Sequence, residues 1–171
     1  MKIIGLTGGI ASGKNFIANI FKQKGAMVFD ADQEVHQILK CDQDAISQIR
    51  NIFPKSFTAD TIDRKKLGEI VFSDAEKLKI LEKILHPKVR KKYEEFIKLA
   101  HKRRVKFAIL NIPLLLEVKI YQCDKIIAII TSQSVQKYRF LNRCRKSNPV
   151  NFMDQIPKLE KKFKDIKAKQ I

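Results

Sequence analysis

A glycine-rich stretch near the N-terminus, GGIASGK from Gly8 to Lys14, offers the clearest chemistry in this sequence. Two glycines five positions apart, followed directly by a lysine, satisfy the first seven positions of the phosphate-loop pattern G-x-x-x-x-G-K-[ST]. Glycines let backbone N–H groups turn inward around an anion, and a following helix directs its partly positive end at the same point. The lysine adds a point charge for the outer phosphates. The stretch therefore predicts phosphate binding, against the alternative of a tight turn that happens to contain a lysine.

Asn15 stands where the pattern has serine or threonine. In phosphate-loop enzymes that hydroxyl binds the magnesium ion that bridges the outer phosphates. An asparagine carbonyl oxygen is also a hard ligand, but its longer side chain carries the oxygen further out. We therefore expect Mg²⁺ to bind at Asn15 more weakly or through a water molecule, which affects catalysis more than nucleotide binding.

These residues can form one site only if the fold brings the carboxyl ends of several strands to the same edge of a sheet. Short apolar runs predict four strands separated by helical stretches, which is typical of an α/β fold with a parallel sheet. Ligands bind at the carboxyl ends of such strands, where both the glycine loop and the acidic DAD segment should lie. The last two strands are almost continuous apolar runs, so we expect both to be covered on two faces. The predicted strands are Lys2–Thr7, Ala26–Phe29, Val105–Ile112 and Asp124–Ile130, and the predicted helical stretches are Lys14–Lys24, Gln33–His101 with breaks at Pro54, Thr58–Asp63 and His86–Pro87, and a basic region from Ser132 on.

The overall composition limits the class of protein. The chain has 171 residues, enough for one domain with a sizeable core, and a formal net charge of +17. Its basic residues are mostly scattered lysines, and only Lys158–Lys169 is dense enough to form a patch. This charge favours small polyanionic substrates or a plain solvated surface, with nucleic-acid binding as the alternative. No apolar run is long enough to span a membrane, and three distant cysteines without a CxxC pair indicate reduced thiols in a cytoplasmic protein. The oligomeric state stays open between a monomer and a weak homo-oligomer.

Five segments together resemble the dephospho-CoA kinase family. They are GLTGGIASGKN, VFDAD, the HP pair at His86–Pro87, IPLLLE at 112–117 and QKYRFLNR at 136–143, in that family's order and at its separations. The resemblance implies ATP-dependent phosphorylation, with Mg²⁺, of the ribose 3′-hydroxyl of dephospho-CoA, the last step of coenzyme A synthesis. It also implies an α/β fold of the P-loop NTPase type, a parallel β-sheet flanked by helices with an inserted helical substrate domain and a lid. The corresponding ranges are a core of 1–32 and 104–135, a helical substrate-binding insertion of 33–103, and a lid and C-terminal helical region of 136–171.

The resemblance also implies roles for single residues. Asp32 matches the family's acid near the acceptor hydroxyl, where a carboxylate can orient that group and accept its proton, with helix capping as the alternative. For Asp30 we expect a cap or an outer magnesium contact. Arg139 and Arg143 share a helix face leading into the lid, with a solvated basic face as the alternative. The expected site comprises catalytic Lys14, Asp32 and Arg143, nucleotide-binding Gly8, Gly9, Ile10, Ala11, Ser12, Gly13, Lys14, Asn15, Phe16 and Arg139, substrate-binding Asp32, Arg64 and His86, and Asn15 as a metal ligand.

A few positions are interpreted less sharply. Arg64 matches a family arginine that could meet a substrate phosphate, and His86 either faces the nucleotide end of dephospho-CoA or is a turn residue. Glu117 could help to shape the site at the end of the third strand. Asn111 stands where other phosphate-loop enzymes hold a metal-binding acid, so DAD is expected to be the acidic element. His36 is assigned no role.

Family members continue beyond the segment equivalent to Gln155–Ile171 into a final strand and a closing helix. The resemblance therefore predicts an open sheet edge beside Lys125–Ile130 and weaker ATP binding. The leading hypothesis is a working dephospho-CoA kinase. The alternatives are a nucleotide-binding remnant without turnover and a different small-molecule kinase on the same scaffold.

Overall fold

The computed structural model describes residues 1–112 and 121–147. The expected roles of Glu117 and of the basic patch at Lys158–Lys169 lie outside these residues. The chain divides into two compact units. We call residues 1–28 with the described residues from 105 on the sheet unit, and residues 29–104 the helical unit.

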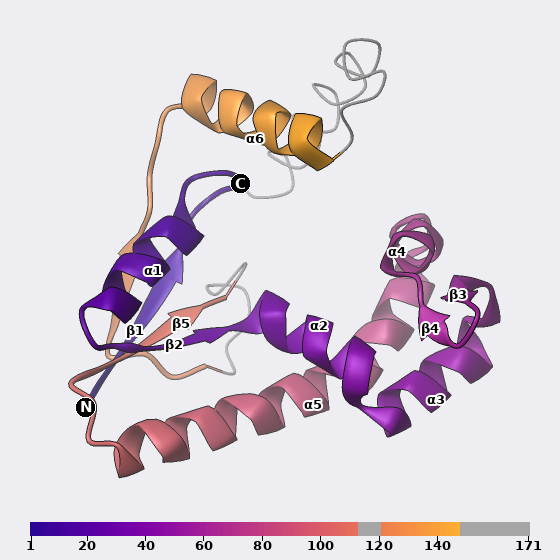
Figure 1. Ribbon diagram of the computed structural model, residues 1–171, viewed down its shortest axis with the longest axis horizontal. Helices are drawn as coiled ribbons and strands as arrows, with labels where there is room; N and C mark the ends of the chain where they lie inside the picture. The colour runs from indigo at the N-terminus through magenta and orange to yellow at the C-terminus, as the bar shows by residue number, and fades with distance from the viewer. Residues whose placement is uncertain (113–120, 148–171) are drawn as a thin grey trace. The chain divides into compact units, whose positions relative to one another are not determined.

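A parallel sheet carries the first unit (Figure 1). The central strand β1 pairs in parallel with β5 on one side and with β6 on the other, and the strand order is β2-β5-β1-β6. The predicted α/β fold is thereby confirmed. The bounds of its elements are β1 Lys2–Thr7, α1 Lys14–Gln23, β2 Met27–Asp30, β5 Phe107–Asn111, β6 Lys125–Ala128 and α6 Gln133–Ser147.

The core of the sheet unit lies between α1 and the two middle strands. Leu6 of β1 and Ile109 of β5 are fully buried, and Ala18 of α1 packs in the same cluster. Ile17 and Phe21 cover this cluster from the same helix, because residues three or four apart share one helix face. The loop between β1 and α1 is therefore anchored at both ends by packed elements.

Strand β6 departs from the expectation that it is covered on both faces. All four of its residues are exposed, and Ile126 has a relative accessibility of 48%. Its apolar sequence correctly predicts a strand, but within the described residues it has β1 as its only neighbour. The prediction of two-sided burial holds for β5 and is wrong for β6.

The second unit is built from helices and a short hairpin. Each of its longer helices begins at an aspartate whose carboxylate accepts backbone N–H bonds of the first turn, which is a favourable N-cap. The predicted interruption at Thr58–Asp63 is a two-stranded hairpin, and Pro54 opens a short 3₁₀ turn. The elements are α2 Ala31–Cys41, α3 Gln43–Ile52, the 3₁₀ turn Pro54–Ser56, β3 Phe57–Thr58, β4 Thr61–Ile62, α4 Arg64–Phe72 and α5 Ala75–Lys102.

Helix α5 runs for 28 residues straight through Pro87. The sequence predicts that His86–Pro87 either kinks or ends a helix, and the continuous helix shows that it does not end one. A proline in a helix interior costs about 3 kcal/mol, because it removes one hydrogen bond and crowds the preceding turn. Buried Leu81, Leu85 and Val89 flank the proline on the packed side of the helix. Burial of each such side chain returns roughly 1.5–3 kcal/mol, which is enough to keep the helix continuous.

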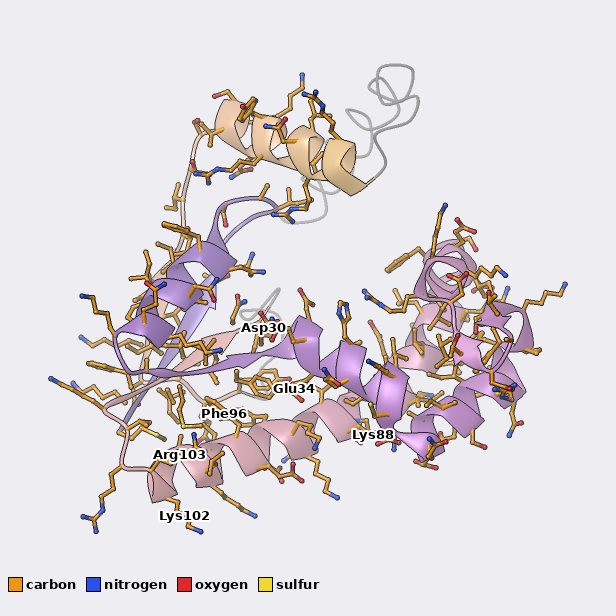
Figure 2. All side chains as sticks on the ribbon, viewed as in Figure 1. Asp30, Glu34, Lys88, Phe96, Lys102 and Arg103 are labelled. Atoms are coloured by element: carbon orange, nitrogen blue, oxygen red, sulfur yellow. The ribbon has the colours of Figure 1, made fainter. Side chains whose placement is uncertain are left out.

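A charged cluster joins α5 to the junction of α2 and α3 (Figure 2). Lys88 Nζ donates to Asp42 and Asp44, each at 2.7 Å. The hydrogen bond from Lys88 lowers the pKa of the Asp42 carboxyl, and the two carboxylates in turn raise the pKa of Lys88. Asp42 also accepts from Ala45 N as the cap of α3, so one carboxylate serves both contacts.

No helix of the described residues is long and apolar enough to cross a membrane.

Candidate nucleotide-binding site

The loop after β1 has the backbone geometry of an anion cradle. Gly8 has a φ of +149°, and a Cβ added there would lie 2.5 Å from the Ile129 carbonyl oxygen. Gly13 has a φ of +109° and forms the N-cap of α1 without a side-chain cap bond. Because no side chain caps this turn, its N–H groups are available to an anion placed within the loop.

Two polar side chains lie at this cradle. The ammonium of Lys14 donates to the Gly8 carbonyl, which places its charge across the loop. The Ser12 hydroxyl is buried and has no hydrogen-bond partner among the described residues. A buried hydroxyl without a partner costs about 1–3 kcal/mol, so a phosphate oxygen that accepts its proton would be favoured.

Helix α6 is docked onto the same loop. Arg139 Nη1 donates to the Ser12 carbonyl oxygen at 3.0 Å, and Phe140 packs with Ala11 in a small buried cluster. An added Cβ at Gly13 would lie 3.3 Å from the Arg139 guanidinium, so the glycine also makes room for that contact. Arg143 follows one turn later on the same helix and is exposed.

The sequence assigned a role to Arg139 but missed Phe140. In the structure the Arg139 guanidinium donates to the backbone of the loop at Ser12, and its expected contact with the nucleotide stays a prediction. The signal for the buried Phe140 is its place beside the arginine, together with Leu141 and Cys144, which pack against the same cluster. Phe16, also expected near the nucleotide, has a relative accessibility of 69% on α1.

A pair of asparagines lies at the end of the loop. Asn111 closes β5 and is buried, and its Nδ2 donates to Asn15 Oδ1 at 3.0 Å. A carbonyl oxygen has two lone pairs, so Asn15 Oδ1 can accept this bond and still bind a metal ion. Within residues 1–112 and 121–147 no group of three or more His, Cys, Asp or Glu side chains could hold a metal ion. The residues present therefore fit Mg²⁺ through one neutral oxygen ligand.

The acidic DAD segment lies at the start of the helical unit. Asp30 ends β2 and caps α2, because its Oδ1 accepts from Gln33 N at 3.1 Å (Figure 2). The expectation of a capping role for Asp30 is confirmed. Asp32 lies in the first turn of α2 with an exposed side chain. The structure thus assigns the capping bond of α2 to Asp30.

The two other expected substrate residues lie apart within the helical unit. Arg64 begins α4, and its Nη1 lies 3.3 Å from Nδ1 of His36 on α2. Both side chains line a pocket of about 340 Å³ that also contains Lys40, Asp60 and Thr61. His86 is exposed within α5. Sequence reasoning assigned no role to His36, and no local pattern could have paired it with a residue 28 positions away.

The chain has an α/β fold with a parallel sheet. Its first strand ends in a glycine loop with a lysine and a helix N-terminus, an arrangement typical of phosphate-loop proteins. The family is shown by comparison. The sequence model of the dephospho-CoA kinase family matches residues 2–162, and the chain belongs to that family.

Individual relatives agree with this assignment. A dephospho-CoA kinase of Bartonella quintana is 41% identical over 172 residues, which cover 100% of this chain and 82% of the relative. A dephospho-CoA kinase of Ehrlichia canis is 39% identical over 84% of this chain and 72% of its own length. Among solved structures, the dephospho-CoA kinase from Campylobacter jejuni superposes with a TM-score of 0.59 at 30% identity, over 94% of this chain and 82% of that one. A Thermus thermophilus protein gives a TM-score of 0.71 at 26% identity, over 94% and 78%.

Proposed function

We propose that this protein transfers the terminal phosphoryl group of ATP to the ribose 3′-hydroxyl of dephospho-CoA and so forms coenzyme A. The observation that carries the proposal is the loop from Gly8 to Lys14, in a chain whose sequence matches the kinase family almost from end to end. Family membership implies ATP as the co-substrate. The positive net charge of the chain suits two substrates that both carry phosphates.

The loop binds the triphosphate in this proposal. Its backbone N–H groups and the Ser12 hydroxyl donate to phosphate oxygens, and Lys14 exchanges its bond to the Gly8 carbonyl for the outer phosphates. Bound Mg²⁺ would neutralise charge on the outer phosphates, held on the protein side by Asn15. Arg143 stabilises charge on the phosphoryl group in transfer, one turn beyond the arginine that holds the loop.

Asp32 is the proposed general base. Its carboxylate orients the acceptor hydroxyl and accepts the proton as the new P–O bond forms. The side-chain capping bond of α2 comes from Asp30 and not from Asp32. We further propose that the helical insertion 33–103 binds dephospho-CoA, with His86 on its exposed surface and Arg64 meeting a substrate phosphate beside His36. The region 136–171 is proposed to act as the lid.

The direct test is a coupled assay of phosphate transfer from ATP to dephospho-CoA with Mg²⁺. Lys14→Ala should lower kcat/KM by at least about a hundredfold, since it removes the charge at the transferred group. Lys22→Ala, near the end of the same helix, is the matched control and should leave the rate unchanged. Equal rates for wild type and Lys14→Ala would overturn the assignment of the loop.

A second pair of variants separates the two aspartates. Asp32→Asn removes the proton acceptor and should lower kcat by about 10²–10⁴-fold with a smaller change in KM. Asp30→Asn keeps the cap, because asparagine caps helices as well as aspartate, and should retain most activity. The reverse ranking would make Asp30 the catalytic acid of the segment.

Two other outcomes would redirect the proposal. ATP binding without transfer would identify a nucleotide-binding protein, and recovery of transfer in Asn15→Ser would trace the loss to that position. Transfer to another acceptor and none to dephospho-CoA would identify a different kinase on this scaffold.

A further inference from the structure

The asparagine pair joins two departures from the usual phosphate-loop pattern. Asn15 is the second residue of α1, where serine or threonine is expected, and Asn111 is the last residue of β5, where a metal-binding acid is expected. The two positions are 96 residues apart in sequence. In the structure they are hydrogen-bonded to each other at 3.0 Å.

The exchange changes the charge of the site. A hydroxyl with a carboxylate carries one negative charge, whereas two amides carry none. A divalent cation is held mainly by negatively charged oxygens, so a neutral pair gives weak affinity for the free ion. The asparagine pair adds no charge of its own, so on this side of the site the charges that hold the metal ion come from the triphosphate.

The hydrogen bond also fixes the orientation of Asn15. An amide nitrogen can only donate, so the bond from Asn111 Nδ2 keeps the carbonyl oxygen of Asn15 turned toward Asn111. The NH₂ group of Asn15 then points away from Asn111. Asn111 is only 4% exposed, and burial restricts its rotamers and strengthens the bond in the low local dielectric. Asn15 itself is exposed on the first turn of α1 and would otherwise rotate freely.

We propose that Asn111 is a positioning residue that holds Asn15 Oδ1 as a neutral oxygen ligand for the metal–ATP complex. The two asparagines together take the place of the hydroxyl and the acid. The protein therefore binds the metal ion as part of the metal–nucleotide complex, and binds the free ion only weakly. This inference rests on the proposed function only in taking ATP as the nucleotide.

The test measures metal binding directly. The affinity of Mn²⁺ for the full chain is followed by electron paramagnetic resonance, with and without the non-hydrolysable analogue β,γ-imido-ATP. Wild type should bind Mn²⁺ appreciably only with the nucleotide. Asn111→Leu, which keeps the branched shape and the number of side-chain heavy atoms, should lower the Mn²⁺ affinity of the nucleotide complex about fivefold, the equivalent of one modest hydrogen bond.

The decisive comparison is the same change in a second background. In an Asn15→Ser background Asn111→Leu should change the affinity by less than about twofold, because the shorter side chain no longer reaches Asn111. In that background Asn111→Asp should raise Mn²⁺ affinity about tenfold by restoring a hydroxyl with a carboxylate. Asn19→Asp, one turn further along α1, adds the same charge without joining the pair and is the control for a general electrostatic effect.

Equal effects of Asn111→Leu in both backgrounds would show that the two residues act independently and would overturn the proposal. So would tight binding of Mn²⁺ to the wild type without nucleotide. Thermal melting checks that each variant is folded, and Asn111→Ser replaces Asn111→Leu if the latter does not fold. Coupled Mn²⁺ binding without phosphate transfer to dephospho-CoA would refute the proposed function alone, whereas transfer without coupling would refute this inference alone.

Discussion

Strands β5 and β6 flank β1 on opposite sides, and both are parallel to it. Their sequences, FAILN and KIIA, are apolar runs of the same kind, yet Ile109 of β5 is fully buried while Ile126 of β6 is 48% exposed. Strand β5 lies between β2 and β1, and in the described part of the chain β6 has a strand on one side only. An apolar run therefore specifies a strand, but the neighbouring elements decide how much of it is buried.

Both strands pair with β1 in a parallel ladder, but their other contacts differ. Strand β5 contributes side chains to the core, whereas β6 is held by backbone contacts at both of its ends. At the start, Asp124 N donates to Ile3 O at 2.8 Å and Asp124 Oδ2 accepts from Ile3 N at 2.6 Å. At the end, Ile129 N donates to Thr7 O at 2.8 Å. Strand β5 thus adds buried side chains to its ladder with β1, whereas the residues of β6 are exposed.

The largest expected effect is a direct contrast of the two strands. Ile109→Ala should reduce the free energy of unfolding by about 3 kcal/mol, through lost burial and the cavity left behind. Ile126→Ala, the matched change in β6, should cost less than about 1 kcal/mol because half of the side chain is already in water. Urea unfolding measures both, and equal losses would show that β6 is packed as β5 is.

A substitution at Gly8 tests the end of β6, because Gly8 lies against the backbone of Ile129. Gly8→Ala places a Cβ 2.5 Å from the Ile129 carbonyl at a φ that L-residues avoid, and should destabilise the protein by about 2 kcal/mol. Gly68→Ala is the control, since its Cβ would meet only the Phe72 ring at 3.4 Å within a helix. That change should be neutral or stabilise by up to about 1 kcal/mol. A harmless Gly8→Ala, by thermal melting, would mean that β6 can shift freely.

The start of β6 depends on one carboxylate. Asp124→Ala removes the acceptor for Ile3 N and should cost about 1 kcal/mol, a typical net value for one hydrogen bond. Asp124→Asn keeps a carbonyl oxygen at the same place and should lose about half as much. If the two variants unfold at the same urea concentration, the side chain does not hold the strand.

The smallest expected effect depends on pH and lies in the helical unit, at the contact of Lys88 with Asp42 and Asp44. Lys88→Met should cost on the order of 1 kcal/mol at neutral pH, because Asp42 and Asp44 lose their partner. The Lys88 hydrogen bond lowers the pKa of Asp42, so this stabilisation is present above the ordinary aspartate range and is lost as the pH falls through the lowered value. Its counterpart, the raised pKa of Lys88, matters only in strongly alkaline solution.

Acid titration then distinguishes this contact from packing. The difference between wild type and Lys88→Met should shrink below about pH 4, whereas the loss in Ile109→Ala should stay constant over the same range. Lys92→Met, which breaks an exposed pair with Glu95 on the same helix, is the control and should stay within about 0.5 kcal/mol of wild type. A pH-independent difference for Lys88→Met would exclude the carboxylates as its cause.

Local patterns predicted the elements well and their surroundings poorly. The bounds of β1 and the start of α1 follow from an apolar run and a glycine–lysine loop, both of which are local signals. Pro87 did not end the helix, although its local cost favours a break. The burial of Leu85 and Val89 outweighs that cost, and it depends on other helices that the local sequence does not reveal. The apolar residues of β6 wrongly predicted burial, because its exposure depends on which strands lie beside it, and only the family resemblance indicated an open edge there.

The same division holds at the site. The phosphate loop and the departure at Asn15 could be read from neighbouring residues, but the partner of Asn15 is close only in the folded chain. Likewise the bond between Arg139 and Ser12 joins residues 127 positions apart. Sequence therefore indicates which residues do chemistry, and the fold shows which of them act together.

The contact between Arg139 and the Ser12 carbonyl couples two equilibria, the binding of a ligand to the loop and the docking of α6. A ligand that favours the loop conformation in which Arg139 holds this carbonyl must also favour the docked position of α6. By thermodynamic linkage, docking of α6 then raises the affinity for that ligand by the same factor. A change that weakens α6 docking should accordingly appear as altered nucleotide affinity, even where it touches no phosphate.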